Sequence, residues 1–150
     1  QGAKIMSLQE PTKKMSKSDE NINASVYLSD DKDTVIRKFR RAVTDSDNRI
    51  IASEDKPGVT NLLTIYCAFR GCTLEEAQKE FEGKGYGDFK LAVGETVADA
   101  IAPVQAEQKR LLADKAYLSG VLKEGAERAF KTARRTLNKV YRKVGFYQGE

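Results

Sequence analysis

The stretch with the clearest potential for chemistry is a lysine-rich segment, "PTKKMSKSDEN", at residues 11–21. Lys13, Lys14 and Lys17 stand among serines and just after a proline, with too little hydrophobic content for packing to hold them. Lysine carries a compact charge on a flexible stem, and serine hydroxyls and turn amides add donors around phosphate oxygens. This segment, called the lysine loop below, predicts a mobile cationic arm that closes over a triphosphate. An ordinary solvated surface loop is the alternative.

Composition limits the remaining chemistry. The chain has 150 residues, 40% hydrophobic and 32% charged, which is typical of one globular domain with an appendage. It contains no histidine, so it supplies no imidazole base, and its two cysteines alone predict no metal site. Because no apolar run reaches the roughly 18 residues of a membrane helix and no signal pattern opens the chain, we expect a cytoplasmic protein without membrane contact. The start, which lacks an initiator methionine, leads us to expect a fragment of a longer protein.

Three helices are predicted in the first two thirds of the chain. The first follows the capping residues at 29–31, the second opens at Pro57 and ends at Gly71, and the third starts at a capping box formed by Thr73 and Glu76. Apolar residues spaced three and four apart give the first helix one buried face. That face consists of Val35, Ile36, Phe39 and Val43.

Two longer helices are predicted after residue 87. One runs from Asp88 to Leu112, with Pro103 kinking or dividing it, and Ser119 and Gly120 mark the next break. The last helix covers residues 121–144 and has a continuous apolar stripe that we expect to be buried. The stripe consists of Leu122, Ala126, Ala129, Phe130, Ala133, Leu137, Val140 and Tyr141.

The fold class predicted from these patterns is all-α. A bundle of about five helices follows a short strand stub, "AKIMSL" at residues 3–8, and the lysine loop. The positive charge is concentrated at the end of the chain, where residues 121–150 hold eight Lys or Arg against three Glu. Such a surface is either a solvated helix face or a contact for a polyanion.

The order of residues in the lysine loop is informative in itself. Residues 14–18 read "KMSKS" and resemble the signature loop of class I aminoacyl-tRNA synthetases. The segments "IMSLQEPTKKMSKSDEN", "RAVTDSDN", "KPGVTNLL" and "EGKGYGDFK" resemble the bacterial tryptophanyl-tRNA synthetase family in the same order and at similar spacing. The resemblance covers essentially the whole chain and corresponds to the C-terminal part of that enzyme.

The resemblance implies a division of labour with a Rossmann-type catalytic domain that this chain lacks. Residues 1–28 would be the end of that domain, and residues 29–150 the helical domain that engages the tRNA anticodon region. Lys14 and Lys17 would hold the β- and γ-phosphates of ATP, accompanied by Mg²⁺, while tryptophan is activated. The backbones of Ile5 and Met15 would meet the adenosine. The ATP-binding residues of the resemblance are Ile5, Lys14, Met15, Ser16, Lys17 and Ser18.

The resemblance also favours tRNA as the partner of the basic last helix, because contact with RNA phosphates needs such a surface. The residues that we select for this contact are Arg134, Arg135, Lys139 and Arg142. The full-length protein is expected to be a homodimer, and the fragment alone is expected to be inactive. Two alternatives stay open: a stand-alone helical RNA-binding module, and a helical interaction protein with a coincidental motif.

Overall fold

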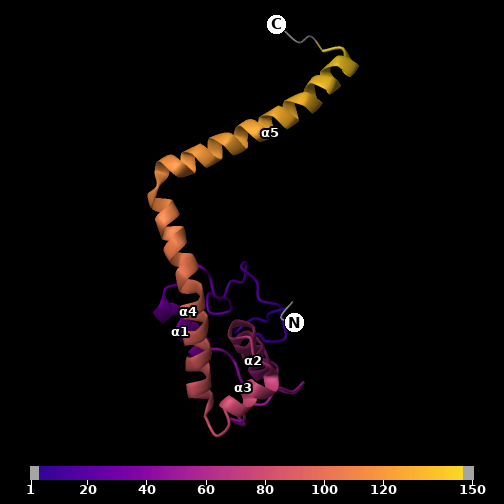
Figure 1. Cartoon of the computed structure of the whole chain (residues 1–150). Coiled ribbons are helices and arrows are strands. Elements are labelled where there is room, and N and C mark those ends of the chain that lie inside the picture. Colours follow the sequence, from indigo (N-terminus) through magenta and orange to yellow (C-terminus); the bar gives the residue numbers. More distant parts are fainter. Residues whose placement is uncertain (1–3, 147–150) are drawn as a thin grey trace. The chain divides into compact units, whose positions relative to one another are not determined.

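The computed structural model describes residues 4–146, and its regular elements are five α-helices (Figure 1). The predicted all-α class is therefore confirmed. The helices are α1 (Lys32–Arg40), α2 (Pro57–Arg70), α3 (Leu74–Glu80), α4 (Tyr86–Ala113) and α5 (Lys115–Val144). The chain forms two compact units, one ending at Gln105 and the other starting at Ala106, so that the boundary falls inside α4.

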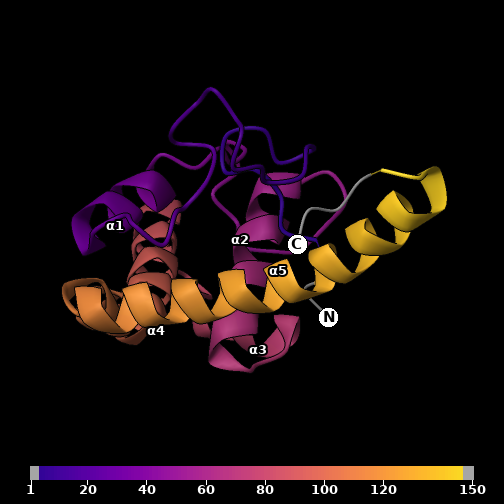
Figure 2. The same cartoon turned by 90° about the horizontal axis from the view of Figure 1, so that it is seen from above.

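The core of the first unit is built from α1, α2, α3 and the first part of α4. Phe81, just after α3, packs edge-to-face against Tyr66 of α2 and Phe89 of α4, with ring centroids 5.0 and 4.9 Å apart. In two views α3 lies beside α2 (Figures 1 and 2). The largest fully buried apolar side chains of the described residues are Phe39, Phe89, Leu8, Leu62, Leu63, Val35, Val59 and Val93.

The predicted strand stub is reduced to one antiparallel bridge, between Met6 and Lys14, in the part of it that is described. The side-chain amide of Asn61 in α2 forms the two backbone hydrogen bonds that a neighbouring strand would otherwise form. Its Oδ1 accepts from the Met6 amide at 2.9 Å, and its Nδ2 donates to the Met6 carbonyl at 2.8 Å. Leu8 follows and is only 1% exposed. The start of the described chain is therefore anchored to the helical core by α2.

The helix ends mostly follow the local signals. α2 starts at Pro57 and ends at Gly71, whose φ of 69° is the left-handed cap geometry that glycine favours. The capping box of Thr73 and Glu76 is present. The prediction for Val43 is wrong, because α1 ends at Arg40 and Val43 is 45% exposed. Its amide donates instead to the Leu8 carbonyl at 2.7 Å.

Pro103 does not divide the long helix, because α4 continues through it to Ala113. The predicted break at Ser119 and Gly120 is wrong, because the break falls at Asp114, whose carboxylate accepts from the Tyr117 amide at 2.9 Å. Ser119 and Gly120 lie inside α5, since glycine in a helix costs only about 1 kcal/mol relative to alanine, whereas Asp114 provides a cap.

The predicted burial of the stripe on the last helix is also wrong for the described residues, because α5 has no buried residue. Leu122 is 73% exposed and Phe130 is 65% exposed. Helical periodicity predicts that one face is apolar, but it does not supply the surface that would cover this face.

Gly58 provides a test of the packing in the first unit. A Cβ at this position would lie 2.1 Å from the carbonyl oxygen of Val43, a contact with backbone that cannot rotate away. We expect Gly58→Ala to lower the free energy of unfolding by about 2 kcal/mol or more, measured by urea denaturation followed by circular dichroism. Gly87→Ala, where no atom lies within 4 Å of the added carbon, is the control. It should be neutral or slightly stabilising, and equal losses in both variants would contradict the packing described here.

Candidate functional site

The lysine loop starts as a backbone ladder. The Met15 amide donates to the Ile5 carbonyl at 3.0 Å, and the Ser7 amide donates to the Lys13 carbonyl at 2.8 Å. Ile5 and Met15, the two residues whose backbones were predicted to meet adenosine, are thus direct neighbours, and both side chains pack against the core. The loop leaves this ladder at a defined place on the core.

The tip of the loop is a hydrogen-bonded turn and not an unstructured arm. Ser16 Oγ accepts from the Ser18 amide at 3.2 Å, and the Ser16 carbonyl accepts from the Asp19 amide at 3.3 Å. The amides of Met15 and Ser18 are therefore engaged inside the protein, whereas the sequence led us to expect exposed turn amides in this loop.

The three lysines of the loop differ in their partners. Lys13 forms an ion pair with Glu10, and the hydrogen bond to this carboxylate raises the pKa of Lys13. Lys14 and Lys17 are exposed and have no ion pair within residues 4–146. Of the three ammonium groups, the two at the predicted phosphate-binding positions are the ones without a carboxylate partner among the described residues. This arrangement can bind an anion without first breaking an internal ion pair.

A neighbouring segment holds the tip of the loop. Ser25 Oγ donates to the Ser16 carbonyl at 2.8 Å, and the Tyr27 hydroxyl donates to the Lys17 carbonyl at 3.3 Å. Sequence reasoning did not identify either residue, because a serine and a tyrosine in a loop carry no local signal for contacts nine and ten residues away. Both contacts engage backbone atoms of the loop and leave the ammonium group of Lys17 in solvent.

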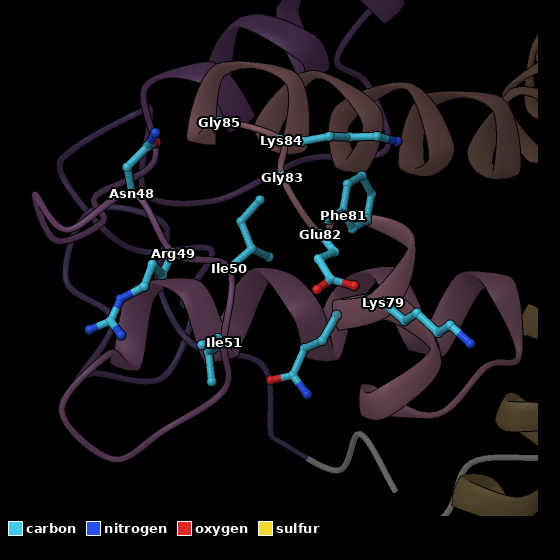
Figure 3. A pocket seen from close by; sticks show the side chains of 11 residues that line it. Asn48, Arg49, Ile50, Ile51, Lys79, Phe81, Glu82, Gly83, Lys84 and Gly85 are labelled. Carbon is cyan, nitrogen blue, oxygen red and sulfur yellow. The ribbon is translucent and has the colours of Figure 1, made fainter.

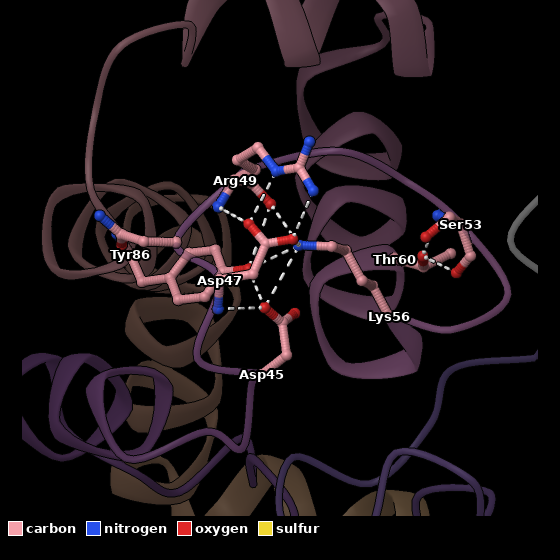
Figure 4. Close-up of polar contacts among 8 residues, drawn as sticks. Asp45, Asp47, Arg49, Ser53, Lys56, Thr60 and Tyr86 are labelled. Atoms are coloured by element: carbon pink, nitrogen blue, oxygen red, sulfur yellow. Dashed lines mark hydrogen bonds and ion pairs between the residues drawn. The ribbon is translucent and has the colours of Figure 1, made fainter.

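A second polar cluster surrounds Lys56, which precedes α2 (Figure 4). Its ammonium nitrogen lies 2.6 Å from Asp47 Oδ2 and 3.2 Å from Asp45 Oδ1. The Tyr86 hydroxyl, at the start of α4, donates to Asp45 Oδ1 at 2.7 Å, and Arg49 binds Asp47 through two nitrogens. The cluster connects residues 45–49 to the first turns of α2 and α4.

The electrostatics of this cluster follow from its contacts. The pKa of Asp47 is well below its ordinary value because Arg49 and Lys56 both donate to it. Burial by itself would raise the pKa of Asp45, but hydrogen bonds from Tyr86, the Asp47 amide and Lys56 outweigh burial and lower it. Burial would likewise lower the pKa of Lys56, yet the bonds to Asp47, Tyr86 and Asp45 raise it. All three groups are held in their charged forms at neutral pH.

A surface pocket of about 630 Å³ lies beside this cluster, between residues 48–51 and residues 78–85 (Figure 3). Gln78 Oε1 accepts from the Ala52 amide at 2.6 Å, and Asn48 Oδ1 accepts from the Tyr86 amide at 2.8 Å, so the two walls are joined by hydrogen bonds. No residue of the lysine loop lines this pocket. Lys13, Lys14 and Lys17 are all exposed outside this pocket.

The four residues selected for tRNA contact all lie on the exposed surface of α5. Arg135, Lys139 and Arg142 are three and four residues apart and share one face, with Arg134 next to them. None of these four forms an ion pair with another described residue. Sequence reasoning overlooked a further basic surface at the C-terminal end of α1, where the exposed residues Arg37, Arg40 and the capping residue Arg41 line a groove of about 450 Å³.

Two further findings concern residues 4–146. This part of the chain contains no helix that is both long and apolar enough to cross a membrane. Its cysteine and acidic side chains form no group of three or more that could hold a metal ion.

The lysine loop, its backbone ladder and the helical core that carries them can be compared with known classes of protein. The family model "tRNA synthetases class I (W and Y)" matches residues 2–102, and the chain belongs to this family. The tryptophan–tRNA ligase of Clostridium perfringens is 46% identical over 97% of this chain, and that of Enterococcus faecalis is 48% identical over 97%. The resemblance found in the sequence is confirmed.

Solved structures show the same relationship. The tryptophanyl-tRNA synthetase from Mycoplasma pneumoniae has a TM-score of 0.68 and 38% identity over 95% of this chain. The enzyme from Campylobacter jejuni has a TM-score of 0.73 and 27% identity over 95%. The chain covers 43% and 44% of those two structures, and 44% and 43% of the Clostridium and Enterococcus relatives. It spans less than half the length of the relatives that it matches.

The cluster around Lys56 predicts a dependence of stability on pH. Because the pKa values of Asp45 and Asp47 are lower in the folded state than the ordinary 3.8, their stabilising effect is complete well above pH 4 and is lost as the pH falls below it. We expect Asp45→Asn to be less stable than the wild type at pH 6 and to lose less stability between pH 6 and pH 3. Urea midpoints across this range measure both effects. Asp55→Asn, at an exposed turn, should keep the wild-type pH profile.

Proposed function

We propose that this chain is the C-terminal part of a tryptophan–tRNA ligase, an enzyme that activates tryptophan with ATP and transfers it to tRNA. The observation that carries the proposal is the KMSKS loop, whose Lys14 and Lys17 are exposed without an ion pair to any described residue. Identity of 46–48% to tryptophan–tRNA ligases over 97% of the chain supports the choice of amino acid. Residues 1–28 then belong to the catalytic domain and residues 29–150 to the helical domain. Since the matches cover under half of the relatives, the remaining catalytic machinery lies outside this chain.

In this proposal the tryptophan carboxylate attacks the α-phosphate of ATP, and pyrophosphate is the leaving group. Lys14 and Lys17 neutralise the β- and γ-phosphates, where negative charge increases as the bond to the α-phosphate breaks. A donor that tightens its contact in the transition state lowers the barrier and does more than bind ATP. Mg²⁺ enters with the ATP phosphates as part of the substrate. The backbones of Ile5 and Met15 contact the adenosine, and Ser16 and Ser18 shape the loop around the phosphates.

The helical part of the chain is proposed to bind tRNA through Arg134, Arg135, Lys139 and Arg142. Their exposure without internal ion pairs among the described residues supports this assignment.

We further propose a cytoplasmic homodimer for the complete protein, without membrane contact. A stand-alone RNA-binding module is the second candidate, favoured by the exposed basic face of α5. Pyrophosphate exchange with tryptophan and ATP separates the two, because the ligase shows this activity in the complete protein and not in this chain alone.

The role of Lys17 is tested by substitution in the complete protein. We expect Lys17→Ala to reduce the rate of tryptophan activation about 10²- to 10³-fold, the usual effect of losing one preorganised donor, with a much smaller rise in KM for ATP. Steady-state pyrophosphate exchange measures both quantities. Lys13→Ala is the matched control, since Lys13 is already paired with Glu10, and should change the rate only slightly. Unchanged turnover in Lys17→Ala with a raised KM would contradict the proposed role.

RNA binding by α5 is tested by titrating this chain with tRNA at several salt concentrations. The slope of log K against log salt is negative, and each lost phosphate contact reduces its magnitude by about 0.7 to 0.9. The double variant Arg135→Gln/Arg142→Gln should therefore reduce the magnitude of the slope by about 1.5 and weaken binding. The control is Arg110→Gln/Arg128→Gln, which removes two arginines that face Glu107 and Glu124 at 2.7 and 3.9 Å. Affinity that does not depend on salt, or equal effects in both variants, would exclude the assignment.

A further inference from the structure

Lys38 is a lysine in an unexpected position. It lies on the inner face of α1 between Val35 and Phe39, and its side chain is only 5% exposed. A buried ammonium group is unfavourable unless it is paired and hydrogen-bonded. Its nitrogen lies 2.6 Å from Asp30 Oδ2 and donates to the Ser25 carbonyl at 2.9 Å. It also lies 4.6 Å from the centroid of the Tyr27 ring.

These contacts all fall within one short segment, residues 25–30. The segment is closed by its own hydrogen bonds, since the Tyr27 amide donates to Asp30 Oδ2 at 2.8 Å and the Asp30 amide donates to the Tyr27 carbonyl at 3.0 Å. Lys38 therefore binds the first residue of the segment through its carbonyl, the middle through an aromatic face and the last through a carboxylate. Lys38 thus contacts the start, the middle and the end of this turn, and Gln105 Nε2 of α4 donates to its Leu28 and Asp30 carbonyls at 2.9 and 2.7 Å.

The same turn contacts the lysine loop. Ser25 and Tyr27 donate through their hydroxyl groups to the carbonyls of Ser16 and Lys17, the third and fourth residues of the KMSKS motif. The chain of contacts thus runs from Lys38 to the 25–30 turn and from there to the backbone of the loop. The Lys17 backbone is held while its ammonium group is left without an ion-pair partner in the described chain.

We propose that Lys38 is a positioning residue for the KMSKS loop and that it acts through Ser25 and Tyr27. The proposal rests on the proposed function for the role of the loop in ATP binding, but the contacts from Lys38 to the loop do not depend on that function. A buried ion pair is weak evidence for stability, because apolar residues of similar volume often replace one without loss. The stronger effect of a buried ion pair is to select one arrangement of the segments that it joins. Loop carbonyls placed in this way determine where the Lys17 side chain begins, and transition-state contacts are sensitive to displacements of about 1 Å.

Tyr27→Phe is the sharpest variant, because it removes one oxygen from a half-buried residue and leaves Lys38, Asp30 and Ser25 in place. Lys38→Met removes the charge but keeps the length and apolar character of the side chain, and Lys38→Arg restores a cation. Tyr117→Phe, at a tyrosine of α5 that is 54% exposed, is the matched control.

The first measurement is hydrogen exchange of this chain, which requires no activity. We expect Tyr27→Phe to speed exchange at residues 15–19 about 2- to 10-fold, the effect of one lost hydrogen bond. Lys38→Met should speed it at least 10-fold, and Lys38→Arg less than Lys38→Met. Exchange within α2, at the buried residues Leu62 and Leu63, should stay unchanged in every variant. Faster exchange in Lys38→Met at α2 and the loop alike would overturn the proposal, because Lys38 would then be a general stabiliser of the fold.

The second measurement is pyrophosphate exchange by the complete protein. Tyr27→Phe and Lys38→Met should lower kcat/KM for ATP by about 3-fold and at least 10-fold, with the KM for tryptophan unchanged, and Lys38→Arg should recover part of the loss. Kinetics of Tyr27→Phe that equal those of Tyr117→Phe would overturn the proposal. If the wild-type protein itself shows no exchange with tryptophan, the proposed function fails, while hydrogen exchange still decides whether Lys38 positions the loop.

Discussion

The backbone groups of residues 5–15 need hydrogen-bond partners, and within the described chain no strand beyond a single bridge supplies them. The partners come from the helical core and its connecting segments. Asn61 of α2 binds both backbone groups of Met6, the Leu8 amide donates to the Ala24 carbonyl, and the Val43 amide donates to the Leu8 carbonyl. Because an unpaired buried backbone group costs about as much as a lost hydrogen bond, these contacts hold the segment in one register. The lysine loop starts from this register, so the backbone positions from which the exposed side chains of Lys14 and Lys17 extend depend on α2.

The lysines of the first unit that matter here differ in burial and in whether they form an ion pair. Lys38 and Lys56 are buried and paired with carboxylates, and each joins a loop to a helix. Lys13 is paired at the surface, whereas Lys14 and Lys17 have no ion-pair partner in the described part of the chain. A bound polyanion therefore meets exposed cations such as Lys14 and Lys17, whereas the charges of Lys38 and Lys56 are neutralised inside the protein.

Local signals in the sequence were reliable at helix ends where a cap forms between residues three or four apart. Pro57, Gly71 and the pair of Thr73 and Glu76 marked their helix ends correctly, because the caps are formed by neighbours in the chain. Gly120 was misleading for the same local reason, since glycine lowers helix propensity without preventing a helix. The apolar stripe of α5 shows the limit of periodicity. The pattern correctly predicted a helix, but burial depends on a covering surface that the pattern does not contain.

The sequence alone determined the all-α class, most helix ends, the family and the KMSKS lysines, because these follow from residue order and from contacts between near neighbours. Only the tertiary structure decided which lysines are free, which are buried and what holds the loop. Asn61 meets Met6 across 55 residues, and Lys38 reaches the turn that binds Ser16 and Lys17. A lysine reads the same in the sequence whether its side chain pairs with a carboxylate or faces solvent. Its role is set by the groups that folding brings within about 3 Å of its nitrogen, and the sequence does not mark which carboxylates these are.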